Sequence, residues 1–65
     1  MRIVVNGAWR ELRAPQLAAA LAELGYEQRV VGTALNGEFV PVGARATTPL
    51  QEGDRLEVLA PVQGG

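Results

Sequence analysis

The chain has 65 residues, which is enough for one small domain. Its six basic residues, all arginine, oppose seven acidic residues, and the formal net charge of -1 leaves no basic footprint for nucleic acid or an anionic membrane. The sequence contains no Cys, His or Lys. These absences exclude disulfides, a thiolate nucleophile, a histidine base or metal ligand, and a Schiff-base amine. We therefore expect a carrier or binding module rather than an enzyme.

The first third of the chain predicts a β-hairpin. Residues 2–6 form a β-branched run, and residues 8–12 supply the return strand. Asn6 and Gly7 lie between them, and both residue types tolerate the positive φ angles that a tight hairpin turn requires. Ile3 and Val5 share one face of the first strand because side chains alternate along a strand.

Residues 15–24 predict the single helix. Its leucines recur at helical spacing and form one apolar stripe, made of Leu17, Leu21 and Leu24. Pro15 suits the first turn and Gly25 suits the position after the helix. Ala14 offers no side-chain acceptor, so the sequence predicts a weak N-cap.

The second half of the chain predicts three more strands. Residues 30–35 and 38–40 flank a second Asn-Gly turn, and residues 55–59 alternate so that Leu56 and Val58 face the core. Residues 43–49 show no periodicity and are expected to form a loop, after which Leu50 returns to the core. Glu52 and Asp54 flank Gly53, and we interpret them as a turn rather than a paired-carboxylate metal site.

The predicted order is β-β-α-β-β-β. This order is typical of an α+β β-grasp domain, with a mixed sheet of four to five strands and one helix packed across it. We place the domain at residues 1–59 and a flexible tail at residues 60–65. The longest uncharged stretch near the N-terminus, residues 3–9, is too short for a signal peptide, so we expect a cytoplasmic protein.

The candidate reactive group is the C-terminal carboxylate of Gly65. A six-residue tail spans roughly 20 Å when extended, and residues without Cβ, such as Gly64, can thread a narrow enzyme channel. The carboxylate could then reach ATP held by a partner, and adenylation would activate it toward a sulfur or nitrogen nucleophile. The alternative is a glycine-rich end without function.

Several residues are candidates for contacts with a partner protein. Leu59 is expected to point outward, and Phe39 is either a partner contact or part of the core; the same two readings apply to Trp9. Arg55 and Glu57, together with Glu38, are either a solvated face or a partner contact. The tail residues Val62 and Gln63 are also assigned to partner contacts. Tyr26 is expected to cover the core rather than to act as a catalytic phenol.

Several motifs of this sequence resemble the ThiS family of sulfur carriers in thiamine biosynthesis. They are V-N-G at 5–7, L-A-E-L-G at 21–25, A-L-N-G-E-F-V-P at 34–41, L-Q-E-G-D-R-L-E-V at 50–58 and V-Q-G-G at 62–65. The resemblance implies that a ThiF-type enzyme uses ATP and Mg²⁺ to adenylate Gly65. It further implies that sulfur from cysteine, delivered through a desulfurase, forms a thiocarboxylate for thiazole synthase ThiG. The carrier itself is expected to bind no cofactor or metal.

Two departures keep alternatives open. Val42 and Gly43 follow the Val-Pro pair where ThiS proteins often have an arginine and an aromatic residue, and Pro61 resembles the prolines of the molybdopterin-synthase small subunit MoaD. A sulfur carrier for molybdopterin or tRNA thiolation is therefore one alternative. A ubiquitin-like modifier joined to lysines through Gly65 is a second alternative, and an inert β-grasp interaction domain is a third.

Overall fold

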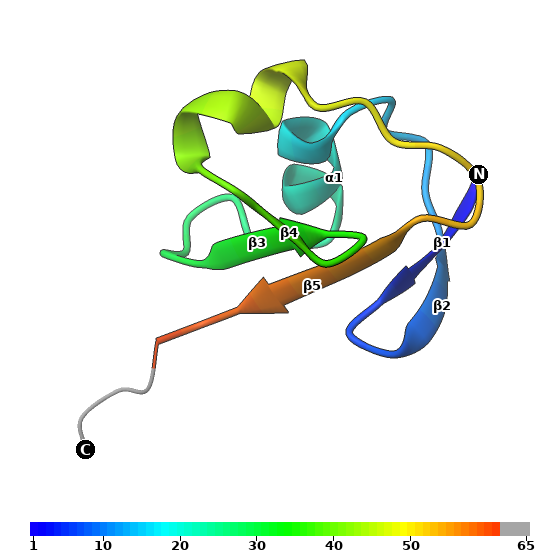
Figure 1. The fold of residues 1–65 in the computed structure, drawn as a ribbon, viewed down its shortest axis with the longest axis horizontal. Coiled ribbons are helices and arrows are strands. Elements are labelled where there is room, and N and C mark those ends of the chain that lie inside the picture. The colour runs from blue at the N-terminus through cyan, green and yellow to red at the C-terminus, as the bar shows by residue number, and fades with distance from the viewer. Residues whose placement is uncertain (62–65) are drawn as a thin grey trace.

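The computed structural model describes residues 1–61 and contains a five-stranded mixed sheet with a helix across one face (Figure 1). Along the chain, the elements are β1 (Arg2–Val5), β2 (Ala8–Glu11), α1 (Leu17–Glu23), β3 (Gly32–Leu35), β4 (Glu38–Val40), the 3₁₀ helix η1 (Val42–Thr47) and β5 (Arg55–Leu59). The strand order is β2-β1-β5-β3-β4, with β1 and β5 parallel and the other neighbours antiparallel. The predicted α+β class and its mixed sheet are confirmed.

Both predicted hairpin turns are present and share one conformation. Asn6 and Gly7 have φ angles of 50° and 86°, and Asn36 and Gly37 have φ angles of 52° and 86°. Positive φ at both central residues defines a type I′ turn, whose twist matches that of the flanking strands. The turns therefore fix the registers of β1 with β2 and of β3 with β4.

Helix α1 begins two residues later than predicted. Gln16, not Ala14, is the N-cap, because its side-chain oxygen accepts a hydrogen bond from the Ala19 amide at 2.9 Å. Gly25 follows the C-cap with a φ of 92°, which confirms its predicted position. Neither helix in the described range 1–61 is long and apolar enough to cross a membrane.

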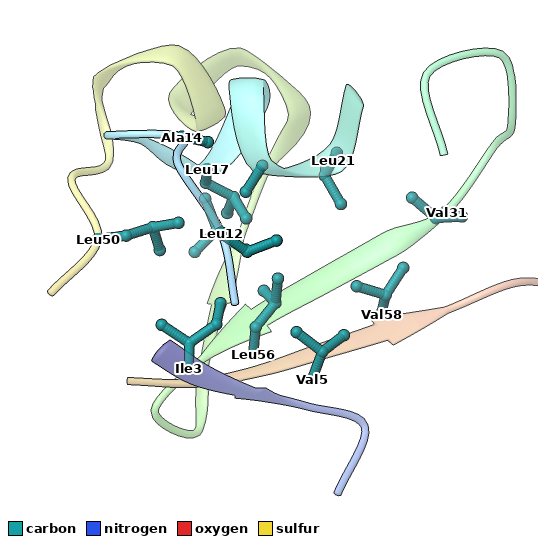
Figure 2. Close-up of a cluster of buried hydrophobic side chains, with 12 residues drawn as sticks. Ile3, Val5, Leu12, Ala14, Leu17, Leu21, Val31, Leu50, Leu56 and Val58 are labelled. Atoms are coloured by element: carbon teal, nitrogen blue, oxygen red, sulfur yellow. The ribbon is translucent and has the colours of Figure 1, made fainter. Parts of the chain in front are cut away.

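The core lies between the sheet and α1. Its largest fully buried side chains are Ile3, Leu17 and Leu56, and Figure 2 shows side chains of β1 and β5 pointing toward the helix. Leu50 is buried as predicted. Leu24 is only half-buried, because it caps the end of the helix rather than lying along its buried stripe.

Two further features differ from the sequence prediction. Residues 43–49 are not a plain loop: η1 occupies most of them, and Arg45 anchors it by donating to the Thr33 hydroxyl at 3.2 Å and to the Val31 carbonyl. These tertiary bonds leave no periodic signal in the sequence. Strand β3 begins at Gly32 rather than at residue 30, because its last partner on β5 is Leu59.

Thr33 is the buried polar side chain that joins these elements, and replacing it with valine should destabilise the domain. Its hydroxyl donates to the Val40 carbonyl at 2.9 Å and accepts from Arg45. Thr33→Val removes both of these hydrogen bonds, so the unfolding free energy should fall by about 1–3 kcal/mol in urea titrations. The exposed Thr47→Val is the control and should stay within about 0.5 kcal/mol. Equal stability of the two variants would contradict this account.

Candidate functional site

The candidate site begins where the central strand of the sheet ends. Strand β5 lies between β1 and β3, and the exposed residues Ala60 and Pro61 follow it, leading away from the helix-covered body (Figure 1). Val62, Gln63, Gly64 and Gly65 lie outside the described residues, so their assigned roles stay predictions. The fold thus directs the chain toward the predicted reactive group from the middle of the sheet.

The sheet face opposite α1 brings most of the predicted docking residues together. Phe39 pairs with Ala34, and Ala34 pairs with Glu57, so these three form one row across β4, β3 and β5. Arg55 and Leu59 lie two positions either side of Glu57 on β5, and therefore face the same way. We call this set, Ala34, Phe39, Arg55, Glu57 and Leu59, the open face.

The apolar residues of the open face are strongly exposed. Phe39 is 74% exposed and Leu59 is 69% exposed. The interpretation of Phe39 as a core residue is therefore wrong, because side chains alternate along β4 and the buried neighbour Val40 is the one that faces the core. The outward orientation predicted for Leu59 is confirmed. Two large apolar side chains exposed to solvent on one sheet face are typical of a protein contact surface.

Trp9 lies on the same side of the sheet but at its far edge. It pairs with Val4, whose neighbours Ile3 and Val5 are buried on the helix side. Trp9 is 57% exposed, so it does not pack in the core, and the Arg2 guanidinium lies 5.1 Å from its ring centroid. This cation–π contact accounts for an exposed indole that lies outside the open face.

Glu38 does not lie on the same side of the sheet as Arg55 and Glu57, although all three are candidates for a partner contact from the sequence. Glu38 pairs with Leu35, which packs against the core, so its side chain points to the helix side of the edge strand β4. The alternation of side chains along β4 separates Glu38 from the adjacent Phe39. The open face therefore carries one arginine and one glutamate, a balanced pair of charges.

The acidic residues before β5 stabilise a turn. Glu52 accepts from the Arg2 amide at 2.9 Å, and Asp54 accepts from the Gln51 amide at 2.8 Å and from Asn36 at 3.1 Å. Within residues 1–61 no group of three or more metal-ligating side chains is found. Tyr26 packs partly buried against the core, as predicted.

The sequence did not predict a shallow hollow beside the start of the tail. Gln28, Arg29 and Val30 line it from one side, and Ala60 and Pro61 line it from the other, around a volume of about 250 Å³. Val30 is 83% exposed here. The sequence predicts a strand at this β-branched residue, but Val30 lies before Gly32, the first residue of β3 that pairs with β5.

A mixed sheet crossed by one helix, with its last strand in the centre, defines a ubiquitin-like β-grasp protein. The model of the ThiS family matches residues 3–65, and this chain belongs to that family. The open face and the tail that follows β5 are therefore features of a ThiS-family chain.

Solved structures and a curated relative agree with this assignment. The crystal structure of a thiamine biosynthesis protein (ThiS) from Geobacter metallireducens matches with a TM-score of 0.84 and 29% identity, over 100% of both chains. A solution structure of a thiamine biosynthesis protein from the same organism matches with a TM-score of 0.80 and 29% identity, over 100% of this chain and 88% of that one. A thiazole synthase from Paramagnetospirillum magneticum is 38% identical over 66 residues. The chain spans 20% of that relative's length.

Proposed function

We propose that this chain is a sulfur carrier for thiamine biosynthesis. The observation that carries the proposal is the family match over residues 3–65, which extends from the first strand through the two glycines. The full-length structural match to a thiamine biosynthesis protein supports the same pathway. A central last strand that leads into an exposed segment suits a carrier whose reactive end must enter another protein.

The proposed chemistry takes place at Gly65 and requires that the mature chain ends there. An oxygen of its carboxylate attacks the α-phosphorus of ATP held with Mg²⁺ by a ThiF-type adenylyltransferase, and pyrophosphate leaves. The terminal sulfur of a persulfide, supplied from cysteine through a desulfurase, then attacks the acyl carbon, and AMP leaves with the former carboxylate oxygen. A thiol reduces the resulting acyl disulfide, which forms a new disulfide and releases the thiocarboxylate. The chain has no Cys, His or Lys, so we assign every catalytic group in this cycle to the partners.

Thiazole synthase is the proposed acceptor of the sulfur. The curated thiazole synthase combines a region similar to this whole chain with a much longer remainder. Such an arrangement supports an association between the carrier and the synthase, since joining two proteins in one chain raises their effective concentration. We further propose that the cycle runs in the cytoplasm, where ATP and cysteine are available.

The open face is the proposed docking surface for the adenylyltransferase. Phe39 and Leu59 supply apolar anchors, and Arg55 and Glu57 supply one charge of each sign. Exposed aromatic anchors commonly dominate the binding energy of protein interfaces. The surface also lies beside the origin of the tail, so a partner bound there would hold the tail near its active site.

Replacing Phe39 should weaken docking without unfolding the domain. Phe39→Ala should raise the Kd for the adenylyltransferase about tenfold or more in calorimetry, because truncating a dominant interface anchor costs about 2 kcal/mol or more and each 1.4 kcal/mol is about tenfold. Val42→Ala is the matched control: Val42 is 72% exposed but lies at the start of η1, outside the open face. Equal Kd values for the two variants would show that the partner does not bind the open face.

A further inference from the structure

The side chain of Asn6 holds the end of β5. Strand β1 pairs with β5 only at Val4 with Arg55 and at Val5 with Leu56, because the chain then turns away at Asn6. The Val58 amide donates to Asn6 Oδ1 at 2.8 Å, and Asn6 Nδ2 donates to the Val58 carbonyl at 3.1 Å. One side chain therefore takes the place of the strand residue that β1 no longer supplies.

The other edge of β5 is held at the neighbouring residue. Leu59 pairs with Gly32 of β3, so Val58 and Leu59 are secured from opposite sides immediately before Ala60. The Asn6 amide also donates to the Leu56 carbonyl at 2.9 Å. The hydrogen bonds of Asn6 thus extend the pairing of β5 on its β1 side as far as Val58, two residues before the predicted tail begins.

The second Asn-Gly turn makes a comparable contact at the other end of the same strand. Asn36 Oδ1 accepts from the Arg55 amide at 2.9 Å, and its Nδ2 donates to Asp54 at 3.1 Å. Glycine and aspartate also tolerate the positive φ of these positions. Of the three, asparagine alone offers both a donor and an acceptor, since glycine has no side chain and ionised aspartate only accepts. Asparagine at position 6 therefore hydrogen-bonds the backbone of β5 as well as accepting the positive φ of the turn.

We propose that Asn6 is a positioning residue for the reaction at Gly65: it fixes the point and the direction in which the tail leaves the sheet. The inference rests on the proposed carrier function. Without the Asn6 side chain, Val58 loses both of its partners on the β1 side and the end of β5 can fray. The partner must then order a longer segment before the carboxylate is in place, and ordering additional residues opposes productive binding.

The test compares two identical substitutions in identical turns. Asn6→Gly and Asn36→Gly both keep a residue that accepts positive φ, and both remove a side chain that binds β5. Each variant is assayed for thiocarboxylate formation with adenylyltransferase, ATP, Mg²⁺ and a sulfur source, well below its unfolding transition. Amide hydrogen exchange of Val58 is measured in parallel. Asn6→Gly should lower kcat/KM and accelerate Val58 exchange by about fivefold to tenfold, whereas Asn36→Gly should change both by less than about twofold.

A second variant covers the case in which Asn6→Gly does not fold. Asn6→Asp keeps the acceptor for the Val58 amide but loses the donor to the Val58 carbonyl, so its kcat/KM should lie between those of the parent and Asn6→Gly. Equal kcat/KM for the position 6 and position 36 variants would overturn the proposal, as would unchanged Val58 exchange in Asn6→Gly. A parent chain that acquires no sulfur would instead overturn the carrier function, and the role of Asn6 in it, whatever the exchange rates are.

Discussion

Deletion of Gly65 should abolish sulfur loading while leaving the unfolding free energy unchanged. The parent chain, incubated with the adenylyltransferase, ATP, Mg²⁺ and a sulfur source, should gain about 16 Da as one oxygen is exchanged for sulfur. The shortened chain places the new carboxylate one residue, roughly 3.3 Å, away from the reacting position, and misplacement on this scale is severe for catalysis. Intact-mass spectrometry measures the loading, and urea titration measures the stability.

Two substitutions at position 64 test whether the width of the tail, and not only its length, limits sulfur loading. Gly64→Val should block loading, because a β-branched side chain restricts φ and ψ and widens the segment that enters the channel. Gly64→Ala is the matched control and should retain more activity than Gly64→Val. A mass gain that survives deletion of Gly65 would contradict the carrier account.

Leu56→Ala should be the most destabilising single truncation on β5. Leu56 is 0% exposed and lies in the core between the sheet and α1. Removing its side chain should lower the unfolding free energy by about 2–5 kcal/mol, a large share of the total for a domain of this size. Chemical denaturation followed by circular dichroism measures the change.

Leu59→Ala provides the matched control on the same strand. Leu59 is three residues away and 69% exposed on the open face, so its truncation should change stability by no more than about 0.5 kcal/mol. It should instead weaken binding of the adenylyltransferase. If the two variants had similar stability, the assignment of the two faces of β5 would be wrong.

Local sequence signals predicted the elements that depend on local chemistry. The two Asn-Gly pairs located both hairpins because few residue types accept positive φ at both turn positions. Alternation in β5 predicted correctly that Leu56 is buried and Leu59 exposed. The mixed sheet with one crossing helix followed from the order of these elements.

Features that depend on distant partners could not be read from the sequence. The 3₁₀ helix η1 is anchored through Arg45 to Thr33 and Val31, and the start of β3 is set by pairing with β5. Gln16 is not a residue type favoured at an N-cap.

The candidate site shows the same division between local and distant causes. The motifs predicted the family, and the alternation of side chains placed Arg55, Glu57 and Leu59 on one face. The exposure of Phe39 and the bonds from Asn6 to Val58 emerged only when the strands were paired. Asn6 carries a local signal for the turn, but that signal contains no information on its contact 52 residues away.

The most direct test of the carrier account is the mass of the protein isolated from its own cells under conditions that preserve thioacids. The account predicts a chain that ends at Gly65, present as a carboxylate and as a second species about 16 Da heavier. Fragmentation should place the added sulfur on Gly65. A chain that continues beyond Gly65, or one joined through Gly65 to a target lysine with no thiocarboxylate present, would contradict it.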